Sequence, residues 1–172
     1  RMFDMISNNA TRLELLVNDL LDLSRIESAD APPIIEQIDL ASLAPKIGEQ
    51  FATLCARRSV SIEYEISEEL GPISTDRTLI TLIVRNLVEN ATKFAREQST
   101  VRVRARAGAV TVDPASPPPS GLVGNSGLLL EVVDKGVGIP LGDQQRIFER
   151  FYQVDGARSG SSVVRGTGLG LA

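Results

Sequence analysis

The chain has 172 residues, 42% of them hydrophobic and 23% charged, a composition typical of a globular protein with a buried core. Its 18 basic and 22 acidic side chains give a net charge of -4, the wrong sign for a nucleic-acid-binding domain. The single cysteine, Cys55, excludes an internal disulfide and argues against structural zinc, and the lack of histidine excludes any step that needs a histidine of this chain.

The first 30 residues show the pattern of an amphipathic helix. Apolar side chains recur from Ile6 to Leu23 at alternating steps of three and four, a stripe that must pack on another helix. Ala31-Pro32-Pro33 ends the segment, because consecutive prolines cannot continue a helix. The pattern favours part of a helical hairpin over a helix docked on its own domain. No apolar run approaches the roughly 18 residues that cross a membrane.

The next segments alternate between helical and strand patterns. Leu43, Ile47, Phe51 and Leu54 predict a helix with Pro45 in its first turn and its end near Arg58. Residues 60–66 alternate between apolar and polar and predict a half-buried strand. Thr75 or Asp76 is expected to cap a helix that runs to about Ala95. Its expected inward residues are Leu79, Leu82, Ile83, Leu87, Ala91 and Phe94.

The second half predicts two more strands. Residues 101–107 alternate small apolar residues with arginines that should face water, and the proline-rich segment 108–127 predicts a long hairpin loop. Residues 128–133 are apolar on both sides and suggest a central strand. Phe148 and Phe151 are expected as core anchors of a short helix. Three strands covered by two long helices predict an α+β fold, a two-layer α/β sandwich.

Three groups of residues suggest chemistry. Asn86, Asn90 and Lys93 share one helical face, which is either a solvated stripe or a site for a magnesium-bound phosphate. Asp134 precedes a glycine bend and either closes a turn or directs its carboxylate at an amine such as that of adenine. Arg150 is either a phosphate contact or an ordinary surface arginine. The glycines at 166, 168 and 170 let backbone N–H groups approach an anion.

The order of these motifs resembles a known family. Residues 86–94, 134–140, 147–152 and 166–172 resemble the N, G1, F and G2 boxes of sensor histidine kinases. The segment 20–27 looks like the second helix of the dimerisation and phosphotransfer hairpin in that family. The resemblance covers nearly the whole chain except the proline-rich loop.

The resemblance implies a Bergerat-type fold of the GHKL ATPase group, preceded by one long helix. Residues 1–30 would be the hairpin helix, 31–38 a linker, and 39–172 a catalytic ATP-binding domain whose last elements lie beyond residue 172. The implied cofactors are ATP and Mg²⁺. The implied activity is a protein-histidine kinase whose phosphoacceptor histidine precedes Arg1, on a helix of the same or the partner subunit.

The same resemblance implies partners and a location. The phosphoryl group would pass on to an aspartate in the receiver domain of a response regulator, and the parent protein would be a homodimer. We expect no nucleic acid partner and no membrane segment in this chain. The expected location is the cytoplasm, with or without a membrane anchor elsewhere in the parent protein.

The resemblance also assigns roles to individual residues. Asn90 matches the magnesium ligand, and Asn86 and Lys93 match contacts to the phosphates. These two and Arg150 are the expected catalytic residues. Phe94 matches an aromatic that lines the nucleotide, and Asp134 the carboxylate that recognises adenine. The other expected cofactor-binding residues are Gly136, Gly138, Ile139, Gly166, Thr167, Gly168, Leu169 and Gly170.

Two alternatives remain open at the level of sequence. One is a non-catalytic nucleotide sensor that controls a partner. The other is a GHKL-type ATPase that hydrolyses ATP by itself. Asn86 argues against hydrolysis, because its amide cannot take a proton from water as the glutamate of the related ATPases does.

Overall fold

The computed structural model describes residues 32–109, 126–154 and 167–171, together with Leu13, Val17, Leu20, Leu21 and Ser24. The chain divides into two compact units, one of Ile34–Val137 and one of Arg1–Pro33 with Gly138–Ala172. Within the described residues, no helix has both the length and the apolar character needed to span a membrane.

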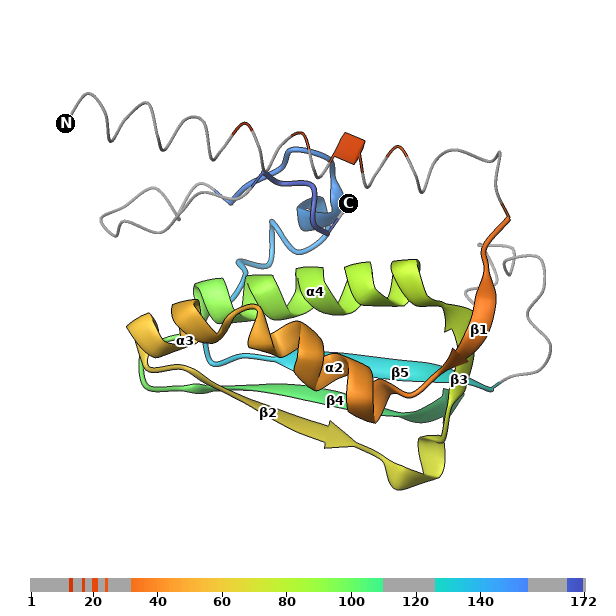
Figure 1. The fold of residues 1–172 in the computed structure, drawn as a ribbon. Coiled ribbons are helices and arrows are strands. Elements are labelled where there is room, and N and C mark those ends of the chain that lie inside the picture. Colours follow the sequence, from red (N-terminus) through yellow and green to blue (C-terminus); the bar gives the residue numbers. More distant parts are fainter. Residues whose placement is uncertain are drawn as a thin grey trace. The chain divides into compact units, whose positions relative to one another are not determined.

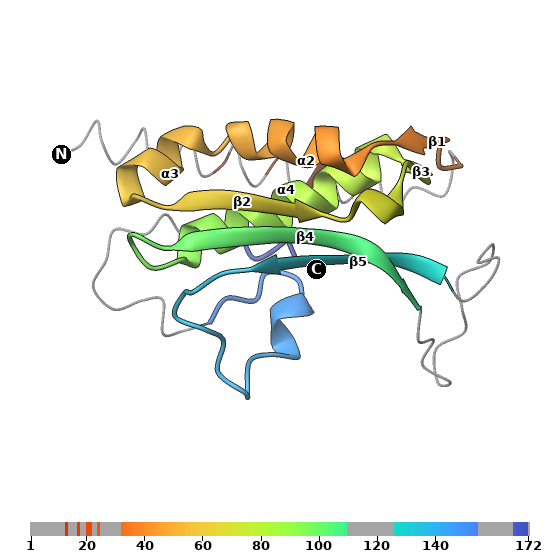
Figure 2. The same cartoon turned by 90° about the horizontal axis from the view of Figure 1, so that it is seen from below.

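The Ile34–Val137 unit has two layers (Figures 1 and 2). Its main sheet has the order β2-β4-β5, with β2 (Ser61–Ile66), β4 (Thr100–Ala109) and β5 (Ser126–Val133). β4 runs parallel to β2 and antiparallel to β5. The helices α2 (Leu40–Glu49), α3 (Ala52–Arg58) and α4 (Arg77–Phe94) lie on one face of this sheet. The predicted two-layer α+β fold is confirmed.

The core lies between the helices and the sheet. Val101, Val103 and Ala105 alternate along β4 and are at most 1% exposed. They meet apolar side chains from the helical layer, where α4 contributes Val84 and Val88, both fully buried. The intervening arginines of β4 face outward as predicted. Two of them pair with β2, Arg102 with Glu63 at 3.2 Å and Arg104 with Glu65 at 2.6 Å.

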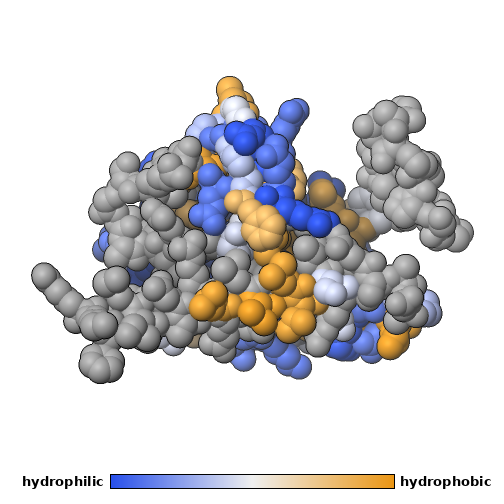
Figure 3. Space-filling view, turned by 90° about the horizontal axis from the view of Figure 1, so that it is seen from above, coloured by the Kyte–Doolittle hydropathy of each residue, from blue (hydrophilic) through white to orange (hydrophobic). Residues whose placement is uncertain are grey.

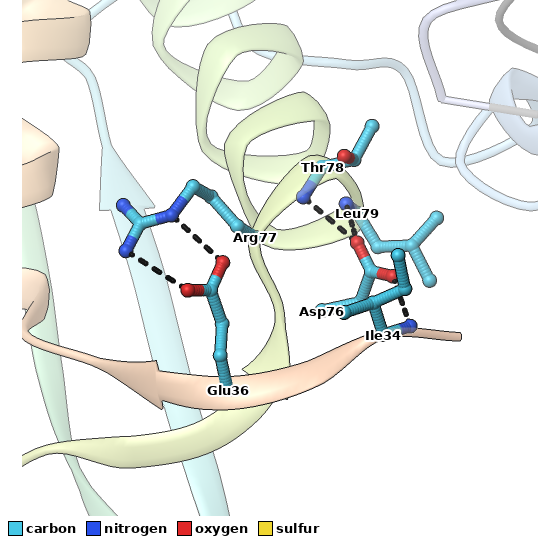
Figure 4. A network of polar contacts seen from close by, with 6 residues as sticks. All are labelled: Ile34, Glu36, Asp76, Arg77, Thr78 and Leu79. Atoms are coloured by element: carbon cyan, nitrogen blue, oxygen red, sulfur yellow. Dashed lines mark hydrogen bonds and ion pairs between the residues drawn. The ribbon is translucent and has the colours of Figure 1, made fainter.

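A second, two-stranded sheet was not predicted. β1 (Ile35–Ile38) pairs antiparallel with β3 (Ile73–Asp76), and β1 lies where the sequence suggested a linker. A 3₁₀ turn, η1 (Glu68–Leu70), precedes β3. Asp76 joins this sheet to α4, because it accepts a hydrogen bond from the Ile34 N–H (2.8 Å) and caps the helix (Figure 4). Both strands are only four residues long, too short to show a clear alternation.

The helix predicted around Leu43 to Arg58 is two helices. Asp39 caps α2 by accepting a hydrogen bond from the Ala41 N–H at 3.0 Å, so the helix begins at Leu40. Pro45 therefore lies inside α2, and its predicted place in the first turn was wrong. At Gln50 the backbone N–H bonds to the carbonyl three residues earlier, which makes a tighter turn, and α3 begins at Ala52. Apolar spacing continues across this break and therefore did not reveal it.

The inward face of α4 also differs from the prediction. The cap at Asp76 and the end near Ala95 are confirmed. However, Leu79, Ile83 and Phe94 are 36%, 49% and 38% exposed. The residues of α4 that are buried are Ile80, Val84, Val88, Ala91 and Thr92. Because α4 has apolar residues on two faces, periodicity alone could not say which face meets the sheet.

Three further predictions concern the second half of the chain. Among the described strands β5 is an outer strand with β4 in the middle, and the predicted central place of β5 stays a prediction. The hairpin between β4 and β5 is confirmed by the pair Ala109 and Ser126, and residues 110–125 lie outside the described part. Phe148, in the 3₁₀ turn η2 (Arg146–Phe148), and Phe151 are 62% and 59% exposed, so they are not core anchors.

The described positions of the first 30 residues are helical, as predicted. Leu13, Val17, Leu20 and Leu21 are between 46% and 63% exposed. Exposed apolar side chains are visible in the space-filling view of Figure 3. The rest of the predicted helix lies outside the described residues, and its packing on a partner helix stays a prediction.

Candidate functional site

Asn86 and Asn90 lie on the outer face of α4, the side that also carries the exposed Leu79, Ile83 and Phe94. Residues 79, 83, 86, 90 and 94 follow one another at steps of three or four and therefore share one side of the helix. Asn86 and Asn90 are half-buried there, between the exposed side chains of Ile83 and Phe94. The ammonium of Lys93 lies 5.7 Å from the centre of the Phe94 ring. A helix that needed only a core contact would not place large apolar residues on this side.

The segment after β5 forms a tight turn. Asp134 follows the last residue of β5, and its Oδ1 accepts a hydrogen bond from the Gly136 N–H at 2.7 Å. One of the two interpretations of Asp134, a residue that closes a turn, is therefore confirmed. The bond uses a single carboxylate oxygen, and a carboxylate can accept several hydrogen bonds. Closing the turn thus leaves the carboxylate able to accept from a ligand.

This turn lies against the C-terminal end of α4. Gly136 forms a β-bridge with Ala95, and the Arg96 N–H donates to the Lys135 carbonyl at 3.3 Å. A Cβ built on Gly136 would overlap the Phe94 carbonyl. The structure therefore brings together two motifs that are about 40 residues apart in the sequence: the end of the asparagine-bearing helix and the Asp134 turn.

The other predicted site residues belong to the second unit. The Phe151 N–H donates to the Gly168 carbonyl at 2.8 Å, so the residues after η2 meet the glycine-rich end of the chain. Gly168 has φ +77°, and a Cβ there would lie 2.7 Å from the Phe151 carbonyl carbon. Leu169 is 7% exposed, and its N–H donates to Thr167 Oγ1 at 3.3 Å. The F and G2 motifs are thus in contact with each other.

The predicted site residues therefore fall into two sets. Within the Ile34–Val137 unit the set is Asn86, Asn90, Lys93, Phe94, Asp134 and Gly136. Within the other unit the described residues are Gly138, Ile139, Arg150, Thr167, Gly168, Leu169 and Gly170. Gly138 has φ +71°, and Ile139 is 43% exposed. Arg150 is exposed, and Gly166 lies outside the described residues.

Sequence reasoning missed Arg58, at the end of α3. Its Nη1 donates to the carbonyls of Thr92 (2.9 Å) and Lys93, and its Nη2 donates to the Ala95 carbonyl at 2.7 Å. These carbonyls belong to the end of α4, next to the Asp134 turn. A basic residue in the last turn of a helix is expected for its own helix, and no signal in the sequence indicated a second helix as its partner.

The polar side chains of the site suit a cation whose ligands are mostly water and phosphate oxygens. Within the described part of the chain, no three His, Cys, Asp or Glu side chains gather closely enough to hold a metal ion. Mg²⁺ keeps several waters and takes phosphate oxygens, so it needs only one or two protein oxygens. The amide oxygen of Asn90, on the outer face of α4, is of the right chemical type.

Comparison with known proteins identifies a family. Residues 75–172 match the family described as histidine kinase-, DNA gyrase B- and HSP90-like ATPases. The chain belongs to this ATPase family. Within it, the asparagine face of α4 and the Asp134 turn are the first two of the motifs that the sequence analysis compared with sensor histidine kinases.

Individual relatives include a sensor protein and a sensor-like histidine kinase. The chain is 32% identical over 170 residues to the alginate biosynthesis sensor protein KinB of Pseudomonas aeruginosa, covering 99% of this chain and 25% of that protein. It is 29% identical to the sensor-like histidine kinase SenX3 of Mycolicibacterium smegmatis, covering 94% and 37%. Among solved structures, full-length ShkA in complex with AMPPNP is 27% identical, with a TM-score of 0.66 over 91% of this chain and 28% of that one. The chain thus spans between 25% and 37% of the length of these relatives.

Proposed function

We propose that this chain binds Mg-ATP and transfers its γ-phosphoryl group to a histidine on a separate helix, as the catalytic part of a sensor histidine kinase. The observation that carries the proposal is the contact between the Asp134 turn and the end of α4. This contact brings together two elements. The Asp134 turn carries a carboxylate that can accept from the adenine amino group, and α4 carries amide and ammonium groups that can bind phosphates. The similarity to ShkA, solved with an ATP analogue, supports it.

Each residue has a role in this proposal. Asn90 supplies an oxygen to Mg²⁺, while Asn86 and Lys93 contact the phosphates, and Lys93 offsets their negative charge. Asp134 accepts a hydrogen bond from the adenine amino group, and Phe94 lines the nucleotide. For the second unit we propose a phosphate contact at Arg150 and nucleotide contacts at Gly138, Ile139, Thr167, Gly168, Leu169 and Gly170. When bound, Mg²⁺ neutralises charge on the phosphate oxygens.

Phosphoryl transfer asks the protein mainly for position and charge. Asn86 cannot act as a base toward water, which leaves a nitrogen nucleophile from the histidine helix as the favoured acceptor. We place this helix in the same or the partner subunit of a homodimer, and we place an aspartate of a response regulator next in the relay. Because ATP is the substrate, we assign the domain to the cytoplasm.

The first test distinguishes the role of Asp134 in closing the turn from its role in binding the ligand. In Asp134→Asn, the side-chain oxygen still accepts from Gly136, but an NH₂ group replaces the second carboxylate oxygen. This donor cannot accept a hydrogen bond from the adenine amino group. We expect near wild-type stability and about tenfold or more loss of ATP affinity in titration calorimetry. Asp134→Ala should lose both stability and affinity. Glu131→Gln, the same change at an exposed position of β5, is the control. Wild-type ATP affinity in Asp134→Asn would contradict the adenine role.

The second test addresses transfer itself. The full chain is mixed with a hairpin domain that carries the phosphoacceptor histidine of a related sensor kinase, and labelled γ-phosphate is followed in the presence of Mg²⁺. We expect an acid-labile phosphohistidine on the hairpin and little free phosphate. ATP binding without phosphohistidine would favour a nucleotide sensor. Release of free phosphate by the chain alone would favour a hydrolase.

A further inference from the structure

The C-terminal end of α4 is completed by a side chain from another helix. The last carbonyls of a helix have no partner within it. α4 leaves the helical conformation at Ala95, which is extended (φ -54°, ψ 149°) and not left-handed, so the usual glycine cap is missing. The guanidinium of Arg58 takes the place of that cap by donating to the carbonyls of Thr92, Lys93 and Ala95.

Arg58 is itself held in place. The Arg58 carbonyl accepts a hydrogen bond from the Gln98 N–H at 3.3 Å, so its backbone also contacts the segment that leaves α4. Ser59 ends α3 in the left-handed conformation (φ 54°), and the Val60 N–H donates to the Cys55 carbonyl at 2.9 Å. Arg58 thus joins the end of α3 both to the end of α4 and to the segment that follows it.

The carbonyls that Arg58 binds adjoin the candidate site. Lys93 and Phe94 lie in the same turn, and Ala95 is the residue that bridges to Gly136. A shift of this turn would move Lys93 relative to the Asp134 carboxylate. We infer that Arg58 is a positioning residue, which fixes the last turn of α4 against the Asp134 turn and so sets the spacing between the phosphate and adenine contacts. This inference rests on the proposed function.

The shape of the side chain matters for this role. A guanidinium is planar and presents donors in a fixed fork, so it can hold several carbonyls at once, and its positive charge is favourable at a helix C-terminus. A lysine ammonium is a compact charge that keeps the favourable electrostatics without the fork. Arg58→Lys and Arg58→Ala therefore remove different parts of the interaction. Arg57→Ala, at the exposed neighbouring position, is the matched control.

The experiment measures ATP affinity of the full chain by calorimetry together with amide hydrogen exchange. We expect Arg58→Ala to weaken ATP binding about tenfold, equivalent to ~1.4 kcal/mol, and Arg58→Lys to weaken it less. Exchange should quicken at the amide of Arg96, which bonds between the two turns, and at the amide of Gly136, which donates to Asp134 within the Asp134 turn. The core amide of Val103 should stay protected. Arg57→Ala should match the wild type in both measurements. A merely structural role would raise exchange throughout the unit.

Each outcome decides the inference. Wild-type affinity and exchange in a folded Arg58→Ala protein would overturn it. If Arg58→Ala does not fold, Arg58→Lys decides, and wild-type affinity there would overturn it. Unfolding of both variants would also overturn it, because Arg58 would then support the whole unit. If the wild type binds no ATP, the proposed function fails, and exchange at Arg96 and Gly136 still tests whether Arg58 positions the turn.

Discussion

Gly136 has no room for a side chain. A Cβ there would overlap both the Asp134 carboxylate and the Phe94 carbonyl. The family resemblance implied a cofactor-binding role for Gly136, and the structure adds a requirement within the protein. The glycine allows the turn after β5 to approach the end of α4. The contact between the Asp134 turn and the asparagine-bearing helix therefore depends on a glycine at this position.

Replacement of this glycine tests the close approach. We expect Gly136→Ala to lower the free energy of unfolding by about 1–3 kcal/mol, because the added methyl must displace backbone. ATP affinity should fall as well, since the same displacement moves Asp134 away from Lys93. Gly142→Ala is the control, because no described atom lies within 4 Å of a Cβ built there. Urea denaturation and calorimetry measure both effects, and equal behaviour of the two variants would contradict this account.

At the scale of elements, the N-terminal end of α4 is held by Asp76 (Figure 4). Its Oδ1 accepts from the N–H groups of Thr78 (2.8 Å) and Leu79 (3.2 Å), and its Oδ2 accepts from Ile34. The neighbouring Arg77 Nε donates to Glu36 Oε1 at 2.8 Å. One end of α4 is therefore fixed to the β1–β3 sheet, and the other end is fixed by Arg58.

The cap at Asp76 predicts a pH dependence. The hydrogen bond from the Ile34 N–H, with those from Leu79 and Thr78, holds the pKa of Asp76 below its ordinary value of 3.8. The carboxylate therefore stabilises the folded chain above pH 3.8, and this contribution disappears as the pH falls through the lowered pKa. In urea denaturation, the stability difference between the wild type and Asp76→Asn should be constant near neutral pH and shrink below pH 3.8. A difference that grows in acid would contradict the assignment.

At the scale of the whole molecule, the core depends on which face of α4 meets the sheet. Ile80 is 6% exposed and Ile83 is 49% exposed, although they are the same residue type on one helix. The first belongs to the cluster between the helices and β4. The second lies on the outer face beside Asn86. The inner face of α4 therefore contributes to the stability of the fold, and the outer face carries residues of the candidate site.

Because the two faces differ in burial, the same substitution should lower the free energy of unfolding by different amounts on each face. Ile80→Ala should lower the free energy of unfolding by about 2–5 kcal/mol, the range for removing a buried isoleucine side chain. Ile83→Ala should cost clearly less, because its side chain already contacts solvent. Chemical denaturation of both variants measures the difference. Equal losses, or a larger loss for Ile83→Ala, would mean that the outer face is buried in the stable form of the molecule.

The sequence by itself determined the local features of this protein. The alternation along β2 and β4, the cap at Asp76 and the order of the four motifs all follow from residues close together in the chain, and they were sufficient to indicate the family. Only the tertiary structure decided the inward face of α4, the place of β4 between β2 and β5, the pairing of β1 with β3 and the partners of Arg58. These depend on contacts between distant segments. Arg58 and its partners are 34 to 37 residues apart, and local periodicity carries no information over that distance.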